Sequence, residues 1–93
     1  MEEILNNLQV GDILYVTTHG IQYLFIRRSH EFSVIYSINQ EHKTLPLNTI
    51  NAAFEAFNNG EEINAQWYIN YNQHEYETRG CNLSVLRGLL SRI

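Results

Sequence analysis

The feature that most constrains the fold is a succession of three strand-like segments between Ile13 and Asn39. Each segment is rich in β-branched and aromatic residues, and short polar turns separate them. His19-Gly20 can occupy the positive-φ positions of a two-residue hairpin, and Ser29-His30-Glu31 provides the second turn. The sequence therefore predicts three antiparallel strands, at ILYVTT (13–18), IQYLFIRR (21–28) and FSVIYSIN (32–39).

These strands are apolar on both sides. Side chains alternate between the two faces of a strand, so Tyr23 and Phe25 share one face of the second strand. Leu24 and Ile26 share the other face. An antiparallel sheet in a small protein commonly leaves one face polar and wet. We therefore expect a sheet that is curled into a barrel, covered on both sides by helices, or paired with another molecule.

Helical periodicity and turn residues predict the remaining elements. A short helix fits residues 2–8, and a fourth strand fits TLPL (44–47) after a turn at QEHK. A helix fits residues 49–58, with Asn48 or Thr49 as its cap. Residues 63–71 alternate as a half-buried fifth strand would, although a helix would still group Ile63, Trp67 and Tyr71.

The chain ends in a predicted amphipathic helix, for which Asn82 offers a cap. Its apolar stripe needs to dock on the domain or on another subunit, and Gly88 in its middle costs up to about 1 kcal/mol unless it permits a close approach. The fold class is thus α+β, with residues 1–93 forming one domain. We expect a four- to five-stranded antiparallel meander, as an SH3-like barrel or a curled sheet, with a helix after strand 4 and this C-terminal helix.

Composition restricts the environment and the partners. Ten acidic and six basic residues give a formal net charge of −4, which is the wrong sign for a protein that grips phosphates over a broad face. No apolar run approaches the length of a membrane span, the N-terminus MEEILNNL lacks the positive charge of a signal peptide, and one cysteine cannot form an intramolecular disulfide. We expect a small soluble cytoplasmic protein without a membrane association.

The aromatic residues of the sheet suggest a protein-interaction surface. Tyrosine tolerates partial exposure and is enriched among interface anchors, and tryptophan shares this enrichment. The leading hypothesis is a non-enzymatic protein–protein interaction module of the accessory, adaptor or inhibitor type. Its partner is another protein or a second copy in a homodimer, and the residues expected at the interface are Tyr15, Tyr23, Phe25, Tyr36 and Trp67.

The basic residues support an alternative from another class. The meander places a cationic group at each end of the sheet, and arginine beside exposed tyrosines can stack single-stranded bases on a small barrel. Arginines at hairpin ends also act simply as solvated guards of a sheet edge. The alternative hypothesis is therefore single-stranded nucleic-acid binding, through Arg27, Arg28, His30 and Lys43.

Catalytic and metal signatures are lacking in the sequence. Cys81 lies beside a predicted helix start, with Arg79 nearby and His74 as a conceivable base, but the surrounding residues match no nucleophile signature. The four histidines are widely spaced and no two are separated by four residues. We predict no enzymatic activity, no cofactor and no metal site.

Overall fold

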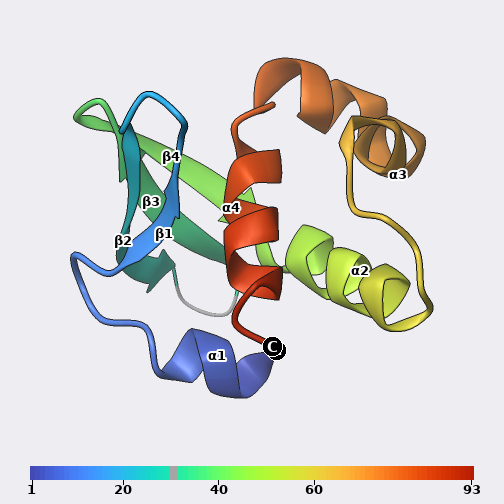
Figure 1. Ribbon diagram of the computed structural model, residues 1–93, viewed down its shortest axis with the longest axis horizontal. Coiled ribbons are helices and arrows are strands. Elements are labelled where there is room, and N and C mark those ends of the chain that lie inside the picture. The colour runs from blue at the N-terminus through green and yellow to red at the C-terminus, as the bar shows by residue number, and fades with distance from the viewer. Residues whose placement is uncertain (30–31) are drawn as a thin grey trace.

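The computed structural model describes residues 1–29 and 32–93, which form a four-stranded antiparallel sheet and four helices (Figure 1). This is the α+β class that the sequence predicts. Within the described residues, no helix has both the length and the apolar character that crossing a bilayer requires. In chain order the elements are α1 (Glu2–Asn6), β1 (Ile13–Val16), β2 (Gln22–Ser29), β3 (Ser33–Ile38), β4 (Glu41–Pro46), α2 (Leu47–Asn58), α3 (Ala65–Thr78) and α4 (Asn82–Leu90).

The sheet is an open meander. Its strands are hydrogen-bonded in the order β1-β2-β3-β4, so β1 and β4 are its two edges. The expected SH3-like barrel is therefore not formed by the described strands, because a barrel requires the first and last strands to pair. The β3–β4 turn also lies earlier than predicted, since Asn39 and Gln40 have positive φ angles of 51° and 68°. Two such residues make a tight hairpin turn, and β4 already begins at Glu41.

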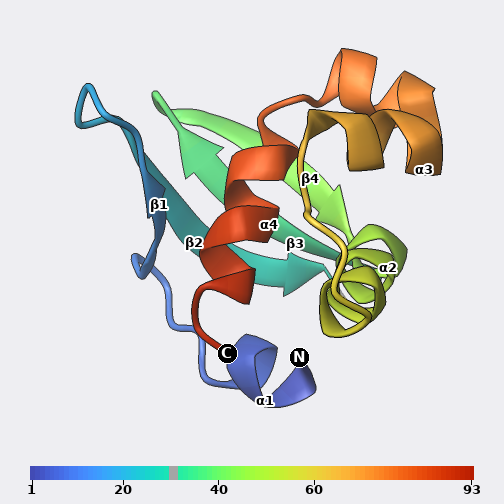
Figure 2. The same ribbon diagram turned by 45° about the vertical axis from the view of Figure 1, so that its right-hand side comes forward.

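Helix α4 lies across one face of the sheet, and this face is the aromatic one (Figures 1 and 2). Tyr23, Phe25 and Tyr36 are buried there in one core cluster with Leu86 and Leu89 of α4. The sheet face that the sequence offers as a partner surface is thus covered by the domain's own helix. The apolar stripe of α4 provides the physical reason, because docking it on the aromatic face removes both surfaces from water.

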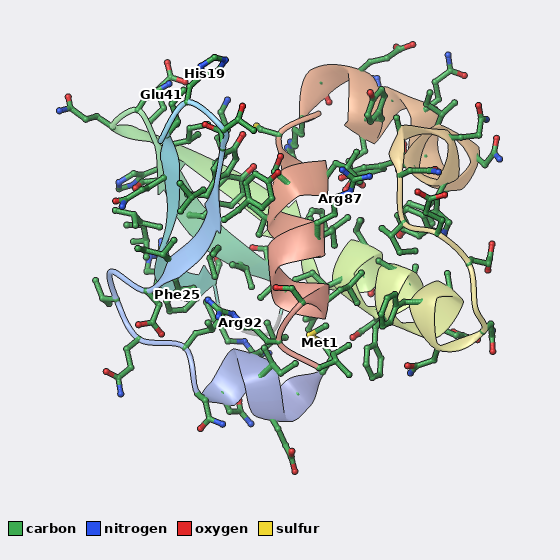
Figure 3. All side chains as sticks on the ribbon, in the orientation of Figure 1. Met1, His19, Phe25, Glu41, Arg87 and Arg92 are labelled. Atoms are coloured by element: carbon green, nitrogen blue, oxygen red, sulfur yellow. The ribbon has the colours of Figure 1, made fainter. Side chains whose placement is uncertain are left out.

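Gly88 allows α4 to approach β1 at backbone distance. A Cβ atom on Gly88 would lie 1.7 Å from the carbonyl oxygen of Leu14, well inside van der Waals contact. The same helix is tied to β1 at its end, where the Arg92 guanidinium donates to the Ile13 carbonyl oxygen at 2.5 Å (Figure 3). The cost of a glycine in mid-helix is therefore offset here by the close packing that only glycine permits.

The opposite face of the sheet has none of the described helices over it (Figures 1 and 2). Leu24 and Ile35 lie on this outer face and are half-buried. Their cross-strand neighbours are polar, because Leu24 pairs with Ser37, and Ile35 pairs with Arg27 and Thr44. The two sheet faces are therefore different in kind: one is an aromatic core, and the other mixes aliphatic and polar side chains.

Residues 65–78 form helix α3, so the prediction of a fifth strand is wrong. The side-chain oxygen of Asn64 accepts a hydrogen bond from the backbone N–H of Trp67 at 2.9 Å and caps this helix. The alternation groups Tyr68 with the polar residues Asn64, Gln66 and Asn70, yet Tyr68 is fully buried. A tyrosine can be fully buried when its hydroxyl is hydrogen-bonded, so the residue pattern fits a helix as well as a strand. The cap at Asn64 favours the helix.

Two polar residues that the sequence suggests as helix caps are instead buried. Helix α2 begins at Leu47 after Pro46, without a side-chain cap, and Thr49 lies inside it. Helix α4 begins at Asn82, and Cys81 precedes it without a capping hydrogen bond. Thr49 and Asn82 are 1% and 0% exposed, so each needs a hydrogen-bond partner within the core.

Candidate functional site

An open groove lies between α2 and α3. Its volume is about 640 Å³. Helix α2, the connector that follows it and the first half of α3 provide the walls. Figures 1 and 2 show these two helices at the same end of the molecule. Its lining residues are Ala52, Glu55, Ala56, Asn59, Glu61, Glu62, Asn64, Gln66, Trp67, Asn70 and Tyr71.

Trp67 and Tyr71 form the aromatic wall of this groove. They are one helical turn apart on α3, and their rings stack with centroids 5.2 Å apart and an interplanar angle of 6°. Trp67 also contacts the buried ring of Tyr68, at a centroid distance of 5.8 Å. Because Trp67 is held between these two neighbours, Tyr71 carries the more accessible ring, and 39% of this residue is exposed. The groove therefore offers a rigid aromatic surface to an occupant.

The groove is also acidic. Glu55, Glu61 and Glu62 line it, and all three are exposed. The ion pairs among the described residues, Arg28–Glu2 and Lys43–Glu41, lie elsewhere in the chain. None of these three carboxylates therefore makes an ion pair within the described part of the domain.

The charge of the whole chain has the same asymmetry. Residues 47–78 contain five of the ten acidic residues, whereas all six lysines and arginines lie outside this range. The α2–α3 region thus carries more than the entire net charge of −4, and the rest of the chain is close to neutral. A potential of one sign that is focused in a groove attracts ligands of the opposite sign.

A buried carboxylate fixes α3 behind the groove. Glu75 is 9% exposed, and its Oε1 atom accepts hydrogen bonds from the Tyr68 hydroxyl at 2.5 Å and the Thr49 hydroxyl at 2.8 Å. Helix α3 is kinked at Asn72, whose side-chain oxygen accepts from the Glu75 N–H at 3.0 Å. Asn72 therefore caps the second half of α3 and lets Glu75 turn inward.

The same hydrogen-bond network continues through α4 into the sheet. Asn82 accepts from the Tyr36 hydroxyl at 2.5 Å, and its amide donates to the Thr44 carbonyl at 3.2 Å and to the Tyr68 hydroxyl at 3.3 Å. No buried side-chain nitrogen or oxygen of the described residues lacks a partner. The network thus joins α2, α3, α4 and the sheet, and it sets the position of the groove relative to the core.

Two tyrosines of this network have raised pKa values. Burial raises the pKa of Tyr36 far above its usual range, and its contact with Cys81 raises it further. Burial also raises the pKa of Tyr68, as does its hydrogen bond to Glu75. Both hydroxyls stay protonated in the folded state at pH values where the unfolded chain releases its tyrosine protons.

We expect the free energy of unfolding to fall above about pH 10, where an unfolded tyrosine ionises. A raised pKa in the folded state means that folding resists the loss of the proton, so the stability is complete below that pH and declines as the pH rises. Each buried tyrosine should contribute a decline of about 1.4 kcal/mol per pH unit. Urea unfolding between pH 8 and 11 measures this slope, which should be shallower in Tyr36→Phe; equal slopes in both proteins would contradict the assignment.

The structure divides the residues expected at a protein interface. Tyr23, Phe25 and Tyr36 are buried in the core, so in this domain they are not an accessible surface, and Tyr15 is half-buried beside Tyr23. Trp67 alone lies in the groove. The sheet aromatics are buried because α4 covers their face of the sheet. Trp67 differs from them because it belongs to α3, which does not lie under α4.

The basic residues of the nucleic-acid hypothesis do not form one patch in the described part of the domain. Arg28 donates to Glu2 at 2.9 Å and to Asn6 at 3.1 Å, so it binds α1. Arg27 is exposed on the outer face, and Lys43 lies 3.7 Å from Glu41 on β4. His30 lies outside the described residues. The tyrosines on which this hypothesis relies for base stacking are in the core or half-buried.

The remaining chemical candidates lie apart from the groove. The Cys81 thiol is 3.4 Å from the Tyr36 hydroxyl and is half-buried at the start of α4. Within the described residues, no three histidine, cysteine, aspartate or glutamate side chains are grouped so that they would hold a metal ion.

Sequence reasoning did not identify the groove, although two signals for it are present. The absence of lysine and arginine between residues 47 and 78 marks an acidic region, and the Asn72-Gln-His-Glu75 spacing is typical of a helix cap within α3. With α3 interpreted as a helix, Trp67 and Tyr71 fall on one side. In comparisons with protein-family models, curated proteins and solved structures, nothing matches this chain.

Proposed function

We propose that this domain is a non-enzymatic protein-interaction module that binds a positively charged segment of a partner protein in the α2–α3 groove. The observation that carries the proposal is the coincidence of three unpaired glutamates with a stacked aromatic pair in one open cavity. The expected cytoplasmic location is part of this proposal. A homodimer is a separate hypothesis, which a light-scattering mass of one chain would contradict.

Electrostatics favours a cationic occupant over an anionic one. A phosphate backbone would meet Glu55, Glu61 and Glu62 at the groove, and like charges repel. A lysine or arginine side chain gains Coulomb attraction from the same carboxylates and a contact with the aromatic rings. The proposal therefore ranks a basic protein segment above a nucleic acid.

Arginine fits the groove better than lysine. The guanidinium group is planar, stacks on aromatic rings and donates to a carboxylate through two parallel N–H groups. Tyr71 provides an accessible ring, and Glu61 and Glu62 are adjacent carboxylates. We therefore use a hexa-arginine peptide as the probe, with hexa-lysine as the weaker cation and hexa-glutamate and oligo-dT as anions.

Hexa-arginine should change the fluorescence of Trp67 in a saturable manner, because Trp67 is the only tryptophan and lies in the groove. The double variant Glu61→Gln/Glu62→Gln should bind the peptide roughly fivefold more weakly at low ionic strength, since two exposed charge pairs are lost. Added salt should weaken binding to the natural domain more than to the variant.

A matched variant separates the groove from net charge. Glu3→Gln/Glu41→Gln removes the same charge outside the cavity and should bind hexa-arginine within about twofold of the natural domain. Equal losses in the two double variants would mean that the peptide responds only to overall charge. A fluorescence change with oligo-dT but not with hexa-arginine would instead favour the nucleic-acid hypothesis.

A further inference from the structure

A second cavity lies on the other side of the connector, between α2 and α4. Its volume is about 260 Å³, and its apolar lining comes from Phe57, Ile63 and Leu90. Glu61 and Glu62 line both this cavity and the groove. The two cavities are therefore adjacent, and a short peptide that lies over Glu61 and Glu62 would reach both of them.

We propose that the partner segment carries a large apolar residue beside its basic residues, and that this residue occupies the α2–α4 cavity. This inference rests on the proposed function. Its basis is that the apolar cavity adjoins the acidic groove and shares Glu61 and Glu62 with it, so that negative charge lies beside the apolar lining. The occupant is thus a mixed motif in which cationic residues face the groove and one aliphatic or aromatic residue enters the second cavity.

Arg87 favours an apolar residue over a basic one in the α2–α4 cavity. It lines the α2–α4 cavity, and its Nε atom donates to the Ile63 carbonyl at 3.2 Å. Figure 3 shows Arg87 on the side of α4 that faces α2 and α3. A fixed guanidinium repels a second cation, so a basic residue gains less here than in the groove. Phe57, which is 42% exposed, gains most from an apolar occupant because its ring is then removed from water.

The test replaces one arginine of hexa-arginine at a time, by leucine in one peptide series and by serine in another. At one position or more, the leucine peptide should bind about tenfold more tightly than its serine counterpart, which corresponds to about 1.4 kcal/mol. Trp67 fluorescence reports both series. In Phe57→Ala this leucine–serine difference should disappear, while the affinity for hexa-arginine stays within about twofold.

The matched control is Phe32→Ala, which removes another exposed phenylalanine outside both cavities. This variant should keep the full leucine–serine difference. If hexa-arginine binds but leucine gives no gain at any position, or if the gain survives in Phe57→Ala, the second-cavity inference is wrong and the proposed function stands. If no peptide binds, the proposed function fails and this inference fails with it.

Discussion

Replacing Gly88 with alanine should lower the free energy of unfolding by about 3 kcal/mol or more. The new methyl group would lie 1.7 Å from the Leu14 carbonyl oxygen and 2.8 Å from the Leu14 carbonyl carbon. Both are backbone atoms of a strand, so the clash is relieved only by moving α4 away from β1. Such a movement opens the core cluster that α4 forms with the aromatic sheet face.

The sign of this effect separates tertiary packing from helix propensity. Alanine stabilises a helix interior by about 1 kcal/mol relative to glycine, so propensity alone predicts a more stable protein. Urea unfolding followed by circular dichroism measures the difference. Gly60→Ala is the control, because a Cβ there meets nothing within 4 Å and only the positive φ of 86° opposes it. A Gly88→Ala variant that is as stable as Gly60→Ala would refute the close approach of α4.

Asn82→Ala should destabilise the domain by about 3 kcal/mol. Asn82 is fully buried and bonds Tyr36 of β3, the Thr44 carbonyl of β4 and Tyr68 of α3. Alanine leaves a cavity and takes away hydrogen-bond partners from buried groups that cannot reach water. The loss should also loosen α3, so Trp67 fluorescence should shift at urea concentrations below the main transition.

Asn51→Ala is the matched control for this substitution. Asn51 is exposed on α2, and alanine favours a helix. The free energy of unfolding of Asn51→Ala should therefore equal that of the natural domain or be slightly higher. Both variants are compared by urea unfolding at pH 7. Equal stabilities of Asn82→Ala and Asn51→Ala would mean that the buried network contributes little to the fold.

The meander could be predicted because its signal is local. Alternation from Ile13 to Asn39, with short polar turns, specifies strands whose neighbours in sequence are neighbours in space. Local signals do not predict which face of the sheet a helix covers. The answer depends on α4, which is far along the chain, and on Gly88, whose role requires knowing that β1 lies beneath it.

The buried network behind the groove could not be predicted, because the sequence pattern around its polar members is typical of other positions. The alternation of residues 63–71 groups Tyr68 with the polar residues of a strand, and the positions of Thr49 and Asn82 are typical of helix caps. In the structure each is buried, and the partners of these hydrogen bonds are 7 to 26 residues apart in the sequence. Single-sequence patterns reveal polarity, but they do not reveal whether water or a distant side chain satisfies a polar group.

Mapping hexa-arginine binding by nuclear magnetic resonance tests the central claim most directly. In ¹⁵N-labelled protein at low ionic strength, the peptide should shift the amide signals of residues 52–71 and the indole signal of Trp67, which belong to the groove and its rim. Signals of β2 and β3 should stay in place. Shifts concentrated in the sheet around Arg27, with the Trp67 indole unaffected, would contradict the assignment of the α2–α3 groove as the binding site.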